Sequence, residues 1–180
     1  MTWSKIARRI RVPLGFLLAI AYIWLAHPTW VSIAIGAVVA FAGVAIRAAA
    51  SGHVKKNQEL TKTGPYAYTR NPLYLGSIII AAGFAIAAIS VWIVLILIIM
   101  FLAIYIPVIR SEEAFLQNTF SDFDDYCSRV PRIVPRFSPA YEGTGTFSRD
   151  LYLKHREYNA LVGTAAMLGA LAIKLLRQHF

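Results

Sequence analysis

The chain has 180 residues, of which 58% are hydrophobic and 15% are charged, whereas a soluble globular domain has roughly 45 to 50% apolar and about 25% charged residues. This composition excludes an ordinary soluble core and a disordered chain. A disulfide-stapled module is also excluded, because Cys127 is the single cysteine. The formal net charge of +9 would suggest nucleic acid in a soluble protein. Here the basic residues flank apolar segments. This arrangement favours membrane lipids with anionic headgroups as partners, and we expect no nucleic acid partner.

Two long uncharged stretches predict two pairs of membrane-spanning helices. About 20 apolar residues of helix cross a bilayer core of about 30 Å, so the 35 residues from Val12 to Ile46 are too many for one span. We expect a break near Pro28. The 37 residues from Leu73 to Ile109 must also fold back on themselves, and we expect a tight helical hairpin that reverses within 87–91. The expected spans are 13–27, 31–50, 72–89 and 91–109.

A fifth apolar stretch, 158–176, is interrupted only by Lys174, whose side chain we expect to snorkel to the interface. It is either a fifth span or an interfacial helix. Small residues at four-residue spacing predict close helix contacts, and they lie at Ser77, Ala81 and Ala85 in the third span and at Gly36 and Ala40 in the second. The fold class expected is all-α: one domain over 1–180, an integral membrane bundle of four to five transmembrane helices with a cytosolic cofactor pocket.

The basic residues set the expected orientation, because short cytosolic loops are enriched in Lys and Arg. They precede the first span, lie between the second and third, and follow the fourth, while the two tight reversals have none. We therefore expect the N-terminus, the 51–71 loop and the 110–157 segment to be cytosolic, in the inner membrane if the chain is bacterial. The basic start and Ala19-Ile20-Ala21 are similar to a cleavable secretory signal. Since further spans follow, we expect the first span to be retained.

Two polar segments on this cytosolic side, 51–74 and 110–137, carry the residues that indicate chemistry. In the first, Gly64-Pro65 predicts a turn, and Asn71-Pro72 predicts a helix start with Asn as N-cap. Interfacial tyrosines and arginines are also typical of aromatic belts and headgroup contacts, which is the alternative for any one of them. In the second, Glu112 and Glu113 place negative charge at a surface that repels anions, so we expect them to face a cation.

The order of these motifs resembles the isoprenylcysteine carboxyl methyltransferase and phospholipid methyltransferase superfamily over about residues 50–137. The pattern is Leu60-Thr61-x-x-Gly64-Pro65-Tyr66-x-x-x-Arg70-Asn71-Pro72-x-Tyr74-x-Gly76, then Glu112-Glu113, then Phe120 and Tyr126-x-x-Arg129-Val130-Pro131-x-x-x-Pro135. The resemblance implies an integral membrane enzyme that transfers a methyl group from S-adenosylmethionine and releases S-adenosylhomocysteine. It implies no Rossmann domain, and the chain has no glycine-rich strand-turn-helix fingerprint.

The resemblance also implies the cofactor contacts. They are Gln58, Glu59, Leu60, Thr61, Tyr66, Asn71, Pro72, Leu73, Tyr74 and Glu112. We expect Glu112 to meet the cationic or hydroxyl groups of the cofactor, and Tyr66 and Tyr74 to supply packing and cation–π contact of about 0.5 to 2 kcal/mol. No metal site is expected.

Two positions depart from the pattern of the superfamily. Asn71 stands where a histidine is usual, and Val108 stands where isoprenylcysteine enzymes have an arginine facing the substrate. Arg110 and Glu113 are the candidate catalytic residues. Arg110 lies on a different helix face from position 108, and Glu113 lies about 100° around the helix from Glu112, so its alternative role is structural or as the partner of a nearby arginine.

Methyl transfer from a sulfonium is a direct displacement, so the enzyme mainly orients the reactants and excludes water. The acceptor is expected to be lipophilic or small, and isoprenylcysteine, a phospholipid amine and a thiol remain open, as does the oligomeric state. One alternative is an NADPH-dependent membrane enzyme like the sterol reductases. A second is a small transporter or scaffold. Transport pathways usually need ionisable groups near the middle of the membrane, whereas the expected spans have them only near their ends, at Arg47 and Lys174.

Overall fold

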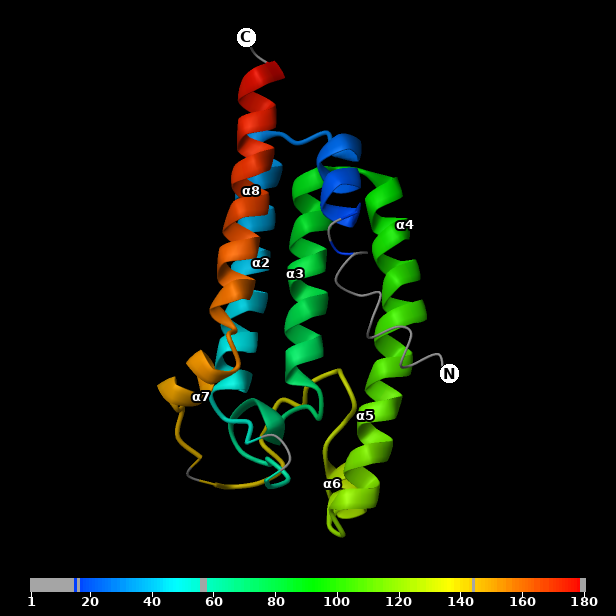
Figure 1. Cartoon of the computed structure of the whole chain (residues 1–180), viewed down its shortest axis with the longest axis vertical. Helices are drawn as coiled ribbons and strands as arrows, with labels where there is room; N and C mark the ends of the chain where they lie inside the picture. Colours follow the sequence, from blue (N-terminus) through cyan, green and yellow to red (C-terminus); the bar gives the residue numbers. More distant parts are fainter. Residues whose placement is uncertain (1–14, 16, 56–57, 144, 179–180) are drawn as a thin grey trace.

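The computed structural model describes residues 15, 17–55, 58–143 and 145–178, and all of these are helix, turn or loop. Residues 17–25 are helical. The elements that follow are α2 (Trp30–Ser51), the 3₁₀-helix η1 (Gly64–Ala67), α3 (Pro72–Ala88), α4 (Val91–Met100), the π-helical turn η2 (Phe101–Tyr105), α5 (Ile106–Thr119), α6 (Phe123–Arg129), α7 (Arg149–Lys154) and α8 (Tyr158–Gln178) (Figure 1). The prediction of an all-α fold is confirmed.

Three of the described helices are long and apolar enough to cross a membrane. They are Trp30–Ser51, the continuous helix Val91–Thr119 formed by α4, η2 and α5, and Tyr158–Gln178, while α3 is a shorter apolar helix of 17 residues. The membrane helical bundle is therefore confirmed, and the stretch 158–176 has the length and composition of a span. The fourth span was expected to end at Ile109, but α5 continues to Thr119. Part of the first expected span, 13–27, lies outside the described residues.

The two expected reversals lie at one end of the bundle, and the loops that carry the motifs lie at the other, which we call the polar end (residues 51–71 and 110–157) (Figure 1). The hairpin reverses at Ile89, whose φ of 47° is left-handed. The backbone N–H of His27 donates to the carbonyl of Ala88 at 2.7 Å, which joins the two reversals. The Lys174 side chain reaches the end of the first helix, next to the first reversal: its ammonium donates to the carbonyls of Ile23 and Ala26 at 2.7 and 2.6 Å, and so caps the C-terminal end of that helix.

Glycines allow α2 and α3 to pack with their backbones in contact. A Cβ added at Gly36 would lie 2.5 Å from the carbonyl oxygen of Gly83, and one at Gly43 would lie 2.6 Å from that of Gly76. The expected stripe on the second span is confirmed at both Gly36 and Ala40, because a Cβ added at Gly83 would lie 2.6 Å from the backbone nitrogen of Ala40. On α3 the closest approach is made by Gly76 and Gly83 instead of the expected alanines, because these glycines repeat every seven residues on the face towards α2. Ser77 of the expected stripe still meets α2, through Arg47.

Candidate functional site

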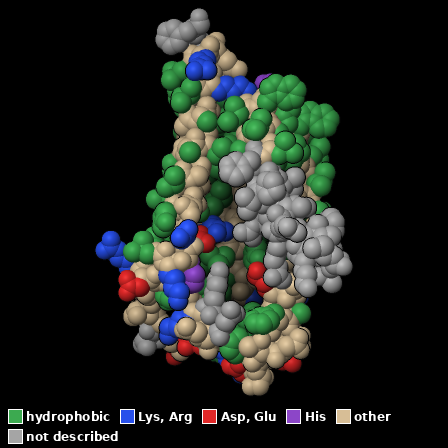
Figure 2. Space-filling view, viewed as in Figure 1, with side chains coloured by type: hydrophobic (Ala, Val, Ile, Leu, Met, Phe, Trp, Pro, Cys, Tyr) green, Lys and Arg blue, Asp and Glu red, His purple; other side chains and the backbone are tan. Residues whose placement is uncertain are grey.

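A cavity of about 680 Å³ lies at the polar end, and the space-filling view shows the molecule hollowed there beneath its apolar upper part (Figure 2). This volume is within the usual range for small-molecule sites. Its walls come from the end of α2, the 51–71 loop, the start of α3, the long helix η2–α5, α6 and the residue before α8. The lining residues are Arg47, Val54, Glu59, Leu60, Thr61, Tyr66, Arg70, Asn71, Pro72, Leu73, Tyr74, Ser77, Tyr105, Ser111, Glu112, Glu113, Phe115, Leu116, Phe123, Tyr126 and Glu157.

The turn predicted at Gly64-Pro65 is the 3₁₀-helix that presents Tyr66 to the cavity. Gly64 has a φ of +57°, and a Cβ there would collide with the ring of His53, so the position favours glycine. The Tyr126 hydroxyl donates to the carbonyl of Tyr66 at 2.8 Å and holds the turn in place. Burial, and then the negative charge of Glu112, raises the pKa of the Tyr66 phenol. Tyr66 is therefore a neutral hydrogen-bonding group and an aromatic surface.

The helix start at Asn71-Pro72 is confirmed, but Asn71 does not act as expected. Pro72 occupies the first turn of α3, while the Asn71 side chain makes no capping hydrogen bond. Its amide donates instead to Glu113 at 3.2 Å and to the carbonyl of Arg132 at 3.0 Å. The reason is that these two acceptors approach from α5 and from the loop after α6. Asn71 thereby ties three segments together at the cavity wall.

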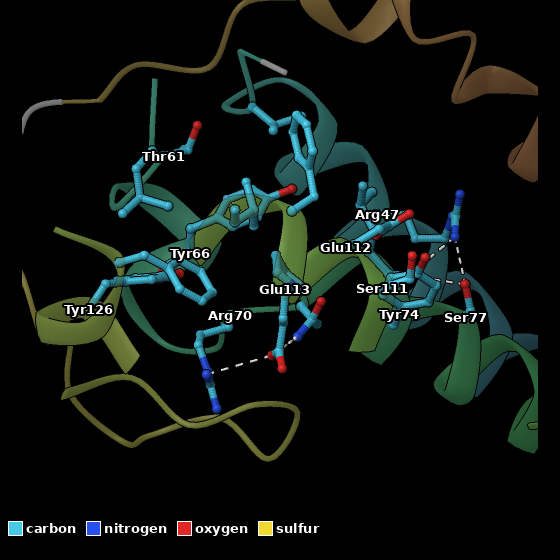
Figure 3. Close-up of a pocket in the computed structure, with 18 of the residues that line it drawn as sticks. Arg47, Thr61, Tyr66, Arg70, Tyr74, Ser77, Ser111, Glu112, Glu113 and Tyr126 are labelled. Carbon is cyan, nitrogen blue, oxygen red and sulfur yellow. Dashed lines mark hydrogen bonds and ion pairs between the residues drawn. The ribbon is translucent and has the colours of Figure 1, made fainter. Parts of the chain in front are cut away.

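The two adjacent glutamates have different surroundings. Glu113 is buried, lies 2.8 Å from Arg132 and 3.6 Å from Arg70, and accepts the amide of Asn71. The Glu112 carboxylate forms no ion pair or hydrogen bond with any residue in the described part of the chain. Figure 3 shows Glu113 directed towards Arg70, whereas Glu112 lies on the side of Arg47 and Tyr74. Glu113 thus takes the structural alternative, as the partner of nearby arginines, whereas Glu112 is exposed.

Sequence reasoning did not assign the Arg47–Glu157 pair to the site. The Arg47 guanidinium donates to both carboxylate oxygens of Glu157 at 2.8 Å, and also to the Leu73 carbonyl and the Ser77 hydroxyl. A lone arginine at the end of an apolar span was the available signal, because such a charge needs a partner. Its partner is 110 positions away, which no local pattern reveals.

Most of the expected cofactor residues line this one cavity. They are Glu59, Leu60, Thr61, Tyr66, Asn71, Pro72, Leu73, Tyr74 and Glu112. Gln58 does not line it, and its side chain is exposed. Arg110, a candidate catalytic residue, is exposed and does not line it either, since it lies about 200° around the helix from Glu112. Val108 is buried among Tyr74, Tyr105 and neighbouring apolar residues.

Among the residues that the structure describes, no group of three or more His, Cys, Asp or Glu side chains could hold a metal ion. The polar groups at the cavity are instead suited to an organic ligand. They comprise a carboxylate without a cation, phenols, the hydroxyl groups of Thr61, Ser77 and Ser111, and an ion pair fixed at the wall. Such groups can form hydrogen bonds and charge contacts with a small organic molecule.

Comparison with known proteins gives a family match and two partial relatives. The sequence model of the family described as phospholipid methyltransferase matches residues 10–122. The nickel-cobalt-cadmium resistance protein NccN of Alcaligenes xylosoxydans xylosoxydans is 39% identical over 84 residues, 47% of this chain and 39% of that protein. The cobalt-zinc-cadmium resistance protein CzcN of Cupriavidus metallidurans is 34% identical over 94 residues, 52% of this chain and 43% of that protein. The matched part is thus less than half the length of these relatives, and no solved structure matches.

Proposed function

The chain belongs to the phospholipid methyltransferase family, whose model matches residues 10–122, and on this premise we propose that it transfers a methyl group from S-adenosylmethionine within the cavity at the polar end. The observation that carries this proposal is the position of Glu112. Its carboxylate has no cationic partner among the described residues, yet it lines the same cavity as Tyr66 and Tyr74. Glu112 is exposed and therefore open to a ligand from solution, and its negative charge favours a cationic ligand that can donate a charge-assisted hydrogen bond.

The donor set of the cavity fits this cofactor. S-adenosylmethionine has a sulfonium, an amino-acid group, a ribose diol and an adenine. Glu112 would meet a cationic or hydroxyl group, and the rings of Tyr66 and Tyr74 would give apolar and cation–π contact. Leu60 and Leu73 provide apolar wall for a base. The amide nitrogen of Asn71 is already occupied, so its oxygen is the atom available to a ligand.

The bound cofactor would supply a methyl group on a cationic sulfur, and the residues of the chain orient the reactants and exclude water. No histidine among the described residues lines the cavity, and Glu113 is held by Arg132 and Arg70. We therefore propose an acceptor whose nucleophilic atom arrives without its proton, such as a carboxylate or a thiolate. A lipophilic or small acceptor would approach along the wall formed by Arg47, Ser77 and Tyr105.

We further propose that the polar end faces the cytosol, in the inner membrane if the host is bacterial. The support is that the basic residues of the 51–71 loop and of the 110–157 segment share this end of the structure, whereas the reversals at 26–29 and 89–90 carry no Lys or Arg. Cofactor made in the cytosol would then enter the cavity directly.

The first experiment measures binding by the purified full chain in detergent. Isothermal titration with S-adenosylmethionine and S-adenosylhomocysteine should show saturable binding, and Glu112→Gln should weaken it about tenfold or more, as expected for the loss of a charge-assisted contact of about 1.5 to 3 kcal/mol. Glu142→Gln, an exposed glutamate that does not line the cavity, is the matched control. Binding of NADPH in place of the methyl donor would favour the reductase alternative, and binding of neither would contradict the proposal.

The second experiment identifies the acceptor. Radiolabel from the methyl donor is followed into a membrane lipid extract, a farnesylcysteine analogue and small thiols, with Glu112→Gln as the reference whose donor binding is weakened. Label in the farnesylcysteine analogue would show carboxyl O-methylation, and label in the lipid extract would show a phospholipid acceptor. Absence of label in all three, despite binding of the donor, would exclude these acceptor classes.

Both relatives are named as resistance proteins for metals that include cobalt and cadmium. We propose that methyl transfer by this chain serves such tolerance, and that the chain does so without a metal site in its described residues. Expression of the wild type in a metal-sensitive host should raise growth on cobalt or cadmium, and Glu112→Gln should abolish the gain. Equal protection by both would separate metal tolerance from methyl transfer.

A further inference from the structure

The loop that follows α6 exposes apolar side chains although it lies outside the helical bundle. Val134 is 76% exposed, and Phe137 is fully exposed. The same segment, 131–139, contains Arg132 and Arg136 and no acidic residue. Two large apolar groups with arginines beside them are a costly arrangement in water, and this combination is typical of contact with a membrane surface.

Backbone hydrogen bonds fix this loop against the residues that precede α3. The N–H of Arg70 donates to the carbonyl of Pro131 at 2.9 Å, and the N–H of Arg136 donates to that of Tyr68 at 3.0 Å. The hydroxyl of Thr69 donates to the carbonyl of Ile133 at 3.0 Å. The loop is therefore held at the level where an apolar helix begins, and Figure 1 shows it rising to the first turn of α3 beside α5.

The charges at this level complement a bilayer. The side chain of Arg136 forms no ion pair with a described carboxylate, and its hydrogen bond within the described residues goes to the carbonyl of Arg129. Arg110 on the neighbouring α5 is also exposed, and the described residues offer it no ion-pair partner. Arginines at the boundary between apolar helix and water meet lipid phosphates, each contributing about 1 kcal/mol near an anionic surface.

We propose that Val134 and Phe137 insert into the interfacial region of the bilayer while Arg136 contacts the phosphate of an anionic phospholipid. The partner is the lipid surface and not a protein, because the loop is fixed beside the membrane entry of α3 and α5, where headgroups already surround the bundle. The loop is also connected to the cavity, because Arg132 in the same loop forms an ion pair with Glu113 in the cavity wall. This inference does not depend on which reaction the cavity supports.

Spin labelling of the full chain in lipid nanodiscs tests the insertion. Nitroxides are placed at Val134→Cys and Phe137→Cys in a Cys127→Ser background, with the label at the exposed Glu142→Cys as the control. The labels at 134 and 137 should be more accessible to oxygen than to a water-soluble nickel chelate, and the control label should show the reverse. Addition of anionic lipid should increase the depth of the labels at 134 and 137 in the bilayer. If the labels at 134 and 137 were as accessible to the chelate as the control label, the proposal would be overturned. A protein partner would then be the better explanation of the exposed apolar side chains.

A second measurement uses the unaltered chain, so it does not depend on Cys127→Ser folding. A phospholipid with a photoreactive group near its glycerol is activated in nanodiscs, and the modified peptides are identified by mass spectrometry. Adducts should appear within 133–137 and be absent from 140–143. Adducts on the spanning helices alone would contradict the proposal.

Discussion

The guanidinium of Arg47, near the end of α2, and the carboxylate of Glu157, just before α8, form a two-pronged ion pair at the cavity wall. Their side chains are 23% and 13% exposed, so neither charge is well solvated. The pair joins the first half of the bundle to its last helix, beyond the region that the family model matches. The residue that precedes α8 is therefore part of the cavity wall, and the ion pair ties the start of α8 to α2.

Glu157→Gln should destabilise the protein by about 2 kcal/mol, because it leaves the positive charge of Arg47 poorly solvated and unpaired. The midpoint of thermal unfolding in detergent should fall, whereas Glu142→Gln should leave it unchanged. Arg47→Gln combined with Glu157→Gln should recover part of the loss, since it removes both charges. If the double variant lost, relative to the wild type, the sum of the losses of the two single variants, the pair would not be coupled.

Glu113→Gln should reduce stability, in contrast to Glu112→Gln, which should reduce only ligand binding. Glu113 is buried and accepts from Arg132, with Arg70 and Asn71 close by, so loss of its charge costs about 1.5 to 3 kcal/mol. Thermal unfolding of the two variants without ligand distinguishes them directly. An unchanged midpoint for Glu113→Gln would show that its ion pairs contribute nothing to stability.

The difference between these two glutamates shows what the sequence reveals of the site. A helical step of about 100° separates their faces, so different roles could be predicted. The identity of the partners could not, because Arg132 and Asn71 reach Glu113 from segments 19 and 42 residues away. For the same reason Arg47 and Glu157 were missed as members of the cavity.

For the membrane spans too, some features could be predicted from the sequence and others could not. Uncharged length and Pro28 predicted where the helices lie and where the hairpin reverses, since hydrophobic thickness limits a span. The face by which α3 meets α2 was predicted wrongly in part, because alanines and glycines are both small. On α3 the closest backbone contacts form at Gly76 and Gly83, and which face turns inward depends on the neighbouring helices.

The tyrosines of the cavity should ionise late in an alkaline titration. Burial raises the pKa of both Tyr66 and Tyr126 above the ordinary value of about 10. Because the raised pKa belongs to the folded state, its stabilising contribution is full below about pH 10 and is lost as the pH rises further. Ultraviolet phenolate absorbance should show a late component that Tyr66→Phe reduces. Loss of an early component instead would contradict the assignment.

Gly43→Ala should destabilise the contact between α2 and α3. An added Cβ would lie 2.6 Å from the carbonyl oxygen of Gly76 and 2.8 Å from the backbone nitrogen of Ile80, so the helices would have to separate. We expect a loss of about 1 to 3 kcal/mol, as for overpacking in a core. Gly163→Ala in α8 is the control, since its Cβ would meet nothing within 4 Å, and the midpoint should hold or rise. A similar response from the two variants would contradict the close packing.

Lys174→Met should detach the end of the first helix from α8. The Lys174 ammonium donates to the carbonyls of Ile23 and Ala26, which otherwise lack a partner in the last turn of that helix. The cost should be about 1 to 2 kcal/mol in stability, because the orphan carbonyls lose a charged donor. Arg177→Met, which replaces an exposed cation one turn further along α8, should have little effect. Amide hydrogen exchange of residues 22–27 measures the same contact locally. If the protection of these amides were the same in Lys174→Met as in the wild type, Lys174 would not hold this turn.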